Sequence, residues 1–205
     1  MSDAPLAAVV LAAGASRRMG APKAALRLGD ATLLARVIDA LSACAPIVVV
    51  AGADEAAVRA ALPAGSAAEV IVNPRPERGQ LSSLQTGLRH LMATSAAPGA
   101  VVALVDHPRV ARETVERLVR AAGGGRHAVV VPVHDGRRGH PIVLMRGVWD
   151  EVLTTPVEKS ARDVVTRDPA RVCEVAVADP GVLIDVDTPD DLAALRRSAP
   201  PAPRR

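Results

Sequence analysis

The residues best suited to chemistry lie in one short loop, residues 11–23, with the sequence Leu-Ala-Ala-Gly-Ala-Ser-Arg-Arg-Met-Gly-Ala-Pro-Lys. Gly14 and Gly20, with small residues around them, let backbone N–H groups approach an anion closely. Arg18 adds a fork-shaped guanidinium and Lys23 adds a compact positive charge to the same loop. This combination of donors indicates a triphosphate site.

Two better-known phosphate loops do not match this segment. Gly14 and Gly20 are six positions apart and Lys23 does not follow a glycine, so the loop is not a Walker A motif. A dinucleotide fingerprint needs G-x-G-x-x-G, which is also missing from the loop. On composition alone, a surface loop rich in Ala and Gly with incidental basic residues remains the alternative.

Acidic residues follow two apolar stretches elsewhere in the chain. Asp106 comes directly after residues 100–105, and in open α/β sheets ligands bind beyond the carboxyl ends of strands. Mg²⁺ usually takes one or two protein carboxylates together with phosphate oxygens, so Asp106 is a candidate ligand. A loop or helix-cap role is its alternative.

The second acidic group is the segment Asp-Val-Asp-Thr-Pro-Asp-Asp at 185–191. If residues 182–186 form a strand, alternation places Asp185 and Asp187 on the same side. Asp190 and Asp191 are better explained as residues that stabilise the positive end of the last helix dipole. The residues themselves leave Asp185 ambiguous between the metal's surroundings and a structural role.

Strand-like and helix-like patterns alternate along the chain, which indicates an α/β domain with a mainly parallel sheet. Strands are expected at 6–11, 47–50, 69–72, 100–105, 128–134, 138–145, 172–177 and 182–186. Helices are expected at 33–41, 54–62, 79–91, 115–122, 148–153, 159–166 and from 189 onward. Asp135-Gly136 suits a tight hairpin turn and predicts an antiparallel excursion, so the sheet is mixed. We expect one Rossmann-like, three-layer α/β/α domain over residues 1–197 and a disordered Pro- and Arg-rich tail at 198–205.

Composition excludes several classes of protein. The chain has 205 residues, no Phe or Tyr and one Trp, so platforms on which nucleic-acid bases stack are missing. The net charge is +3 and no arginine run exceeds two, which argues against nucleic acid as a partner. Cys44 and Cys173 form no metal or disulfide pattern, which indicates a reducing, cytoplasmic location. No apolar run reaches the length of about 18 residues that a membrane span needs, and Asp3 argues against a secretory signal.

The loop at 11–23 resembles L-A-A-G-x-S-x-R-M-G-x-P-K, the signature of the MobA-like nucleotidyltransferases, and every fixed letter is present. That family includes molybdenum cofactor guanylyltransferases and cytidylyltransferases and has the fold of the nucleotide-diphospho-sugar transferases. The resemblance implies that Arg18 and Lys23 grip the triphosphate of an NTP. It also implies that backbone groups hold the base and ribose at four consecutive residues, Leu11, Ala12, Ala13 and Gly14.

Two further segments resemble the metal-binding elements of that family. The residues around Asp106 resemble its D-x-P element, whose Asp binds the metal. Residues 185–192 resemble its D-x-D-T-P-x-D-L element, so Asp187 is the implied second ligand for Mg²⁺. Arg18, Lys23 and Asp106 are therefore the residues expected to carry catalysis.

The start of the predicted helix at residue 79 could bind an anion through its amides and hydroxyls, or its polar residues could be simple caps. Residues 73–88 resemble the N-x6–7-G-x-x-x-S-L-x-x-G-L element of the cytidylyltransferase branch. This implies that Asn73 and Ser82 contact the nucleotide and that Gln80 and Ser83 lie toward the acceptor. The G-H-P element around His140 implies a contact with the acceptor phosphate.

The family resemblance implies transfer of NMP from an NTP to a phosphorylated small molecule, with release of pyrophosphate. Molybdopterin is the favoured acceptor, and a contact with a molybdoenzyme is a further partner that the family suggests. The segment 50–52, Val-Ala-Gly, lacks the polar residue that the guanylyltransferase branch has for its base, so CMP is favoured over GMP. The alternatives are a sugar 1-phosphate acceptor, or an accessory protein that binds nucleotide without turnover. Retention of both Asp106 and Asp187 argues against the accessory protein.

Overall fold

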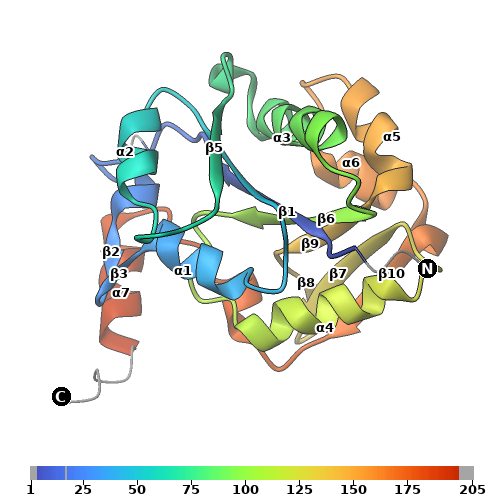
Figure 1. Ribbon diagram of the computed structural model, residues 1–205. Coiled ribbons are helices and arrows are strands. Elements are labelled where there is room, and N and C mark those ends of the chain that lie inside the picture. The colour runs from blue at the N-terminus through green and yellow to red at the C-terminus, as the bar shows by residue number, and fades with distance from the viewer. Residues whose placement is uncertain (1–3, 17, 199–205) are drawn as a thin grey trace.

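A mixed, eight-stranded sheet forms the centre of the computed structural model, which describes residues 4–16 and 18–198 (Figure 1). Its strands are β1 (Ala7–Ala12), β4 (Ile47–Ala51), β5 (Glu69–Val72), β6 (Gly99–Leu104), β7 (Val129–His134), β8 (Arg137–Arg138), β9 (Ile142–Met145) and β10 (Val172–Ala176). The order is β10-β7-β9-β6-β1-β4-β5, with β8 paired to β7. Within this order β9 alone runs against its neighbours, so the mostly parallel mixed sheet is confirmed.

Helices cover both faces of the sheet and complete the predicted three layers (Figure 1). The helices are α1 (Leu33–Ala40), α2 (Glu55–Ala60), α3 (Gln80–Thr94), α4 (Arg112–Gly123), α5 (Trp149–Thr154), α6 (Ala161–Thr166) and α7 (Pro189–Ser198). Alternate residues of β1 divide between two cores: Val10 packs with α1 and α4, whereas Val9 packs with α3, α5 and α6. No helix in the described part of the chain combines the length and the apolar character needed to cross a bilayer.

A third, smaller core lies beside the sheet, where α7 packs on a two-stranded ribbon of β2 (Arg27–Leu28) and β3 (Ala31–Thr32). Leu28, Val186 and Leu192 are among its buried residues. The ribbon was not predicted, because strands of two residues carry no readable periodicity. Ser198 ends α7, and the rest of the predicted tail lies outside the described residues, as does Asp3.

The predicted strand at 182–186 is wrong. Pro180–Leu183 forms a 3-10 turn, in which the Asp179 carboxylate accepts from the N–H of Gly181 at 2.8 Å. The carbonyl of Val182 accepts from the N–H of His140 instead of from a sheet partner. The apolar alternation that suggested a strand therefore reflects burial of Val182 and Val186 in a packed connection.

The predicted strand at 138–145 is divided into β8 and β9. Pro141 has no N–H to give to a ladder, and the N–H of Gly139 bonds to the carbonyl of Pro132. A Cβ on Gly139 would lie 2.4 Å from the Val182 carbonyl oxygen, so this break packs directly against the 3-10 turn. The other predicted elements are confirmed within a few residues of their expected ends.

Glu151 on α5 joins that helix to the segment before β10. Its carboxylate accepts from Arg171 at 2.6 and 3.1 Å and pairs with Arg167 at 2.6 Å. The hydrogen bonds from Arg171 hold the pKa of Glu151 below its ordinary value of 4.5. The interaction therefore stabilises the fold above about pH 4.5 and is lost as pH falls through the lowered pKa.

We expect Glu151→Gln to lower the melting temperature by several degrees at pH 7, because hydrogen bonds to a charged group contribute about 1.5–3 kcal/mol. The difference from the unsubstituted chain should narrow as pH falls below about 4.5, since the carboxylate then gains its proton. Thermal melts followed by circular dichroism from pH 7 to pH 3.5 measure this. A difference that stays constant across this range contradicts the assignment.

Candidate active site

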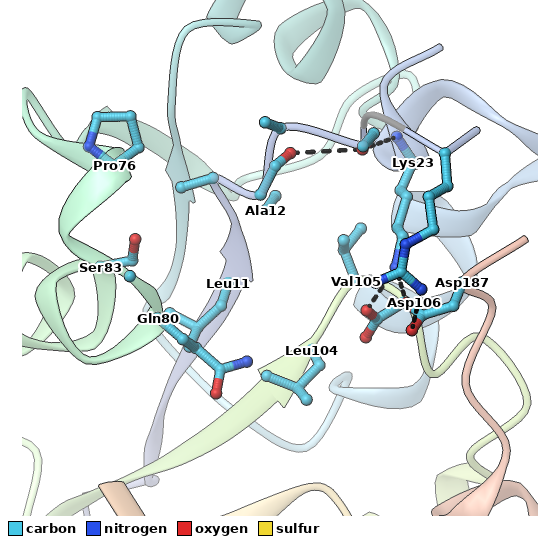
Figure 2. Close-up of a pocket in the computed structure, with 16 residues that line it drawn as sticks. Leu11, Ala12, Lys23, Pro76, Gln80, Ser83, Leu104, Val105, Asp106 and Asp187 are labelled. Carbon is cyan, nitrogen blue, oxygen red and sulfur yellow. Dashed lines mark hydrogen bonds and ion pairs between the residues drawn. The ribbon is translucent and has the colours of Figure 1, made fainter. Parts of the chain in front are cut away.

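A cavity of about 420 Å³ opens at the carboxyl ends of β1 and β6. Four segments form its walls, as Figure 2 shows: the loop after β1, the loop before α3, the end of β6 and the segment before α7. Its lining residues are Leu11, Ala12, Ala13, Gly14, Ala15, Ser16, Arg18, Lys23, Pro76, Gly79, Gln80, Ser83, Leu104, Val105, Asp106 and Asp187. The cavity therefore lies where ligands of open α/β sheets bind.

Charged side chains converge at one end of this cavity. The Lys23 ammonium lies 2.9 Å from Oδ2 of Asp106 and 2.6 Å from Oδ1 of Asp187 (Figure 2). Arg18 adds a guanidinium 3.7 Å from the other oxygen of Asp187. Lys23 has 15% of its side chain exposed, whereas the side chain of Arg18 is 75% exposed. The structure thus brings together the two basic and two acidic residues that the sequence singled out.

The loop after β1 turns back on itself and so returns Lys23 to the sheet. Ser16 and Gly20 adopt positive φ angles of 45° and 67°. The Ser16 hydroxyl accepts from the backbone N–H of Lys23 at 3.0 Å, which closes the loop. Gly52, at the end of β4, allows a close approach, because a Cβ there would lie 2.7 Å from the carbonyl oxygen of Ala13.

Two backbone contacts set the positions of the acids. The N–H of Val186 donates to the carbonyl of Asp106 at 2.9 Å, which holds the segment before α7 against the end of β6. Asp191 accepts from the N–H groups of Asp187 and Thr188 at 3.0 and 2.7 Å. Asp191 therefore caps the start of α7, as its predicted structural role requires, and leaves the Asp187 carboxylate directed at Lys23.

This arrangement keeps Lys23 and Asp187 charged. Burial lowers the pKa of Lys23, but hydrogen bonds to Asp187 and Asp106 and their negative charge outweigh it, so the pKa is raised above 10.5. The hydrogen bond from Lys23, helped by its positive charge, lowers the pKa of Asp187 below 3.8. At neutral pH the cavity therefore holds an ammonium between two acidic side chains.

The acids fit a divalent cation that also binds phosphate. Oδ1 of Asp106 is buried and has no hydrogen-bond partner among the described residues, and a cation would satisfy it. The described residues contain no group of three or more His, Cys, Asp or Glu side chains able to hold a metal by themselves. Two carboxylates without a third suit Mg²⁺ or Mn²⁺, which complete their shells with phosphate and water oxygens. Asp185 is exposed and does not line the cavity.

Polar side chains of a different kind lie at the other end of the cavity. Gln80 and Ser83, on the first turn of α3, lie across the cavity from Lys23 (Figure 2). Asn73 and Ser82 do not line the cavity, and the Asn73 amide donates to the hydroxyls of Ser82 and Ser83 at 2.7 and 3.0 Å. Asn73 and Ser82 thus brace the wall from behind, and their direct contact with a nucleotide stays a prediction.

His140 lies outside the cavity, against another histidine. Its ring centroid is 5.3 Å from that of His107, whose Nδ1 is buried and has no hydrogen-bond partner in the part of the chain that the structure describes. Burial, with a smaller contribution from His107, lowers the pKa of His140 to about 4, so the imidazole is neutral at pH 7. The structure does not bring His140 to the cavity, and its predicted contact with an acceptor stays a prediction.

Six of the described residues that line the cavity were not among the predicted site residues: Ala15, Ser16, Pro76, Gly79, Leu104 and Val105. Pro76 and Leu104 line the cavity, and Ser16 closes the loop that carries Lys23. Ser16 is a fixed letter of the loop signature, and Leu104 lies two residues before Asp106 in an expected strand. Both positions therefore had a weak signal in the sequence. Pro76 had none, because its position depends on the packing of its loop against Gly52.

Comparisons with known proteins match nearly the whole chain. A model of the MobA-like NTP transferase domain matches residues 8–172. A probable molybdenum cofactor guanylyltransferase from Mycobacterium avium strain 104 is 34% identical over 197 residues, 94% of this chain and 96% of the relative. The crystal structure of Rv0371c from Mycobacterium tuberculosis H37Rv has a TM-score of 0.78 and 31% identity, and covers 97% of this chain and 100% of that one. A complex of Rv0371c with manganese has a TM-score of 0.76 and 28% identity, and covers 95% of this chain and 100% of that one.

Proposed function

The chain belongs to the MobA-like NTP transferase family, and from this premise we propose that it transfers GMP from GTP to the phosphate group of molybdopterin. The observation that carries the proposal is the junction of Lys23, Asp106 and Asp187 at the carboxyl ends of the strands. An ammonium and two carboxylates at one end of a cavity of about 420 Å³ suit the charged half of a nucleoside triphosphate.

In the proposed reaction an oxygen of the acceptor phosphate attacks the α-phosphorus of the NTP. A new P–O bond forms, the bond from the α-phosphorus to the α–β bridging oxygen breaks, and its electrons leave with pyrophosphate. Lys23 and Arg18 bind oxygens of the departing phosphates as negative charge develops on them. Asp106 and Asp187 would hold the divalent cation, which when bound neutralises charge on the phosphate oxygens.

The reaction requires no general base from the protein. The second pKa of a phosphate monoester is about 6, so the acceptor is a dianion at neutral pH. The contribution of the chain is therefore positioning and charge stabilisation.

Placing the phosphates near Lys23 directs the nucleobase toward Gln80 and Ser83. We therefore propose that these two residues contact the base, and not the acceptor as the sequence resemblance implied. Their amide and hydroxyl supply donors and acceptors that the end of β4 lacks, since Gly52 has no side chain. The sequence favoured CMP, but the relatives named guanylyltransferases support GMP, and a polar pair at Gln80 and Ser83 supports the same base.

Two measurements test the base and the acceptor. In thermal shift with Mg²⁺ or Mn²⁺, GTP should raise the melting temperature more than CTP, ATP or UTP, because selective binding stabilises by mass action. Pyrophosphate release should then require GTP, a divalent cation and molybdopterin, and chelation with EDTA should stop it. Release with a sugar 1-phosphate would identify another acceptor class, and nucleotide binding without release in any combination would indicate an accessory protein.

Ser16 offers a test of the loop closure. We expect Ser16→Ala to lower kcat/KM about two- to tenfold, because one neutral hydrogen bond that positions Lys23 is lost. Ser66→Ala is the matched control, since Ser66 also accepts from a backbone N–H, at 3.2 Å, and lies outside the cavity. Steady-state pyrophosphate release measures both variants. Equal rates for Ser16→Ala and the unsubstituted protein contradict the role of the hydroxyl.

A further inference from the structure

A second polar cavity lies behind the loop that forms one wall of the nucleotide cavity. Its volume is about 390 Å³, and its walls come from residues 73–78, one face of α3 and the segment after α5. Pro76 and Gly79 of the same loop line the nucleotide cavity, whereas Arg75 and Arg78 line this one. The loop therefore separates two cavities that are lined by different sets of residues.

Three arginines line this second cavity: Arg75, Arg78 and Arg89. Among the described residues, none of the three guanidinium groups has a hydrogen bond or an ion pair. All three arginines are exposed, so solvent reaches their guanidinium groups. Glu77 lies between Arg75 and Arg78 in the chain but does not line the cavity. The hollow thus gathers three positive charges, and no acidic residue is among the described residues that line it.

The wall opposite the loop is a polar face of α3. Ser82, Gln85, Thr86 and Arg89 follow at spacings of three, one and three residues and share one side of the helix, away from the apolar side that packs on the sheet. The buried Gln85 amide donates to the carbonyls of Val152 and Thr155 at 2.9 and 2.8 Å, which fixes this face against the end of α5. The Ser82 hydroxyl donates to the carbonyl of Arg75 at 3.1 Å and fixes the loop. The walls that carry the arginines are therefore held in place before any ligand arrives.

We propose that this cavity binds a small phosphate-bearing anion, at a site separate from the NTP. Guanidinium groups match phosphate oxygens in pairs of hydrogen bonds, and three unpaired ones around a polar hollow favour a multiply charged anion over a neutral ligand. A volume of about 390 Å³ accommodates a phosphate or a diphosphate. The ligand class is thus defined by charge and size, and it does not depend on which base or acceptor the nucleotide cavity uses.

Titration calorimetry with inorganic pyrophosphate as the probe, in EDTA, tests this proposal. Lys23→Gln weakens anion binding in the nucleotide cavity and leaves the second site to be measured by itself. In that background we expect one pyrophosphate to bind, and we expect Arg75→Gln with Arg89→Gln to weaken it by about tenfold or more. Arg126→Gln is the control, because Arg126 is exposed and lines neither cavity, and it should leave the affinity unchanged.

The proposal is overturned if Lys23→Gln abolishes pyrophosphate binding, or if the double arginine variant binds as tightly as its parent. Binding of an acidic peptide, but not of pyrophosphate or phosphate, to the Lys23→Gln protein also overturns it and assigns the surface to a protein partner. Melting temperatures within about a degree of the parent confirm that the variants are folded. These experiments measure binding and not turnover. If the proposed reaction fails, pyrophosphate can still bind at the second site, so the two failures are distinguishable.

Discussion

Asp106→Asn is expected to lower pyrophosphate release by about a hundredfold to a thousandfold while the fold stays intact. The substitution keeps the size and shape of the side chain but removes the charge from the residue that directly follows Val105 at the end of β6. It also replaces one carboxylate oxygen with an amide nitrogen that cannot bind a cation, in a side chain whose buried Oδ1 has no partner within residues 4–16 and 18–198. Turnover should therefore be lost because metal binding is impaired and not because the protein unfolds. Steady-state pyrophosphate release and a thermal melt measure the two effects separately.

Asp185→Asn is the matched control for this prediction. Asp185 is a nearby acid in the same segment as Asp187, but it is exposed and does not line the cavity. We expect rates close to those of the unsubstituted protein. A rate for Asp106→Asn close to that of the unsubstituted protein would remove Asp106 from the metal site. A loss in Asp185→Asn as large as that of Asp106→Asn would place the metal elsewhere.

Lys23→Met should have two opposite effects. The triphosphate loses a positive charge, so kcat/KM should fall by about a hundredfold. At the same time, Mn²⁺ should bind the nucleotide-free protein more tightly. In the unsubstituted protein the Lys23 ammonium lies between Asp106 and Asp187 and repels a divalent cation, and the substitution removes this repulsion. Pyrophosphate release measures the first effect, and the free Mn²⁺ signal in electron paramagnetic resonance measures the second.

Lys159→Met is the control, since Lys159 is the only other lysine of the chain and is exposed outside the cavity. Both its rate and its Mn²⁺ affinity should match those of the unsubstituted protein. If Lys23→Met weakens Mn²⁺ binding instead, the ammonium supports the cation site and does not compete with it. In that case the role assigned to Lys23 is wrong.

Local patterns were sufficient to predict most of the fold and the charged end of the site. Val9 and Val10 belong to a short apolar stretch that a buried parallel strand requires, and the glycine-bearing loop and Asp106 directly follow such strands. The rule that ligands bind at the carboxyl ends of strands then brings the two segments together. The contact between Lys23 and Asp106, which are 83 positions apart, shows at 2.9 Å that these two segments meet.

The errors arose where burial came from packing and not from a regular element. Val182 and Val186 are buried as a strand residue would be, yet one lies in a 3-10 turn against Gly139 and the other packs with Leu192 of α7. A single sequence shows the apolar spacing but not the surface that covers it. Gln80 and Ser83 line the cavity, and their predicted contact with an acceptor stays a prediction.

Local sequence patterns could have predicted only part of the arginine grouping behind the loop. Ser82, Gln85 and Arg89 share a helical face, which periodicity shows. Arg75 and Arg78 belong to a loop and a 3-10 turn without periodicity, so their position beside that face depends on the hydrogen bond between Ser82 and the Arg75 carbonyl. This grouping is therefore a property of the folded chain.

Gly52 restricts how this enzyme could change its nucleobase in evolution or in the laboratory. A Cβ at that position would meet the Ala13 oxygen at 2.7 Å and a Pro76 carbon at 3.2 Å, so any larger residue must push apart two walls of the cavity. Mutational routes to a new base that begin at the end of β4 are therefore closed unless both loops move together. Libraries directed at Gln80 and Ser83 explore positions that line the cavity and already carry side chains.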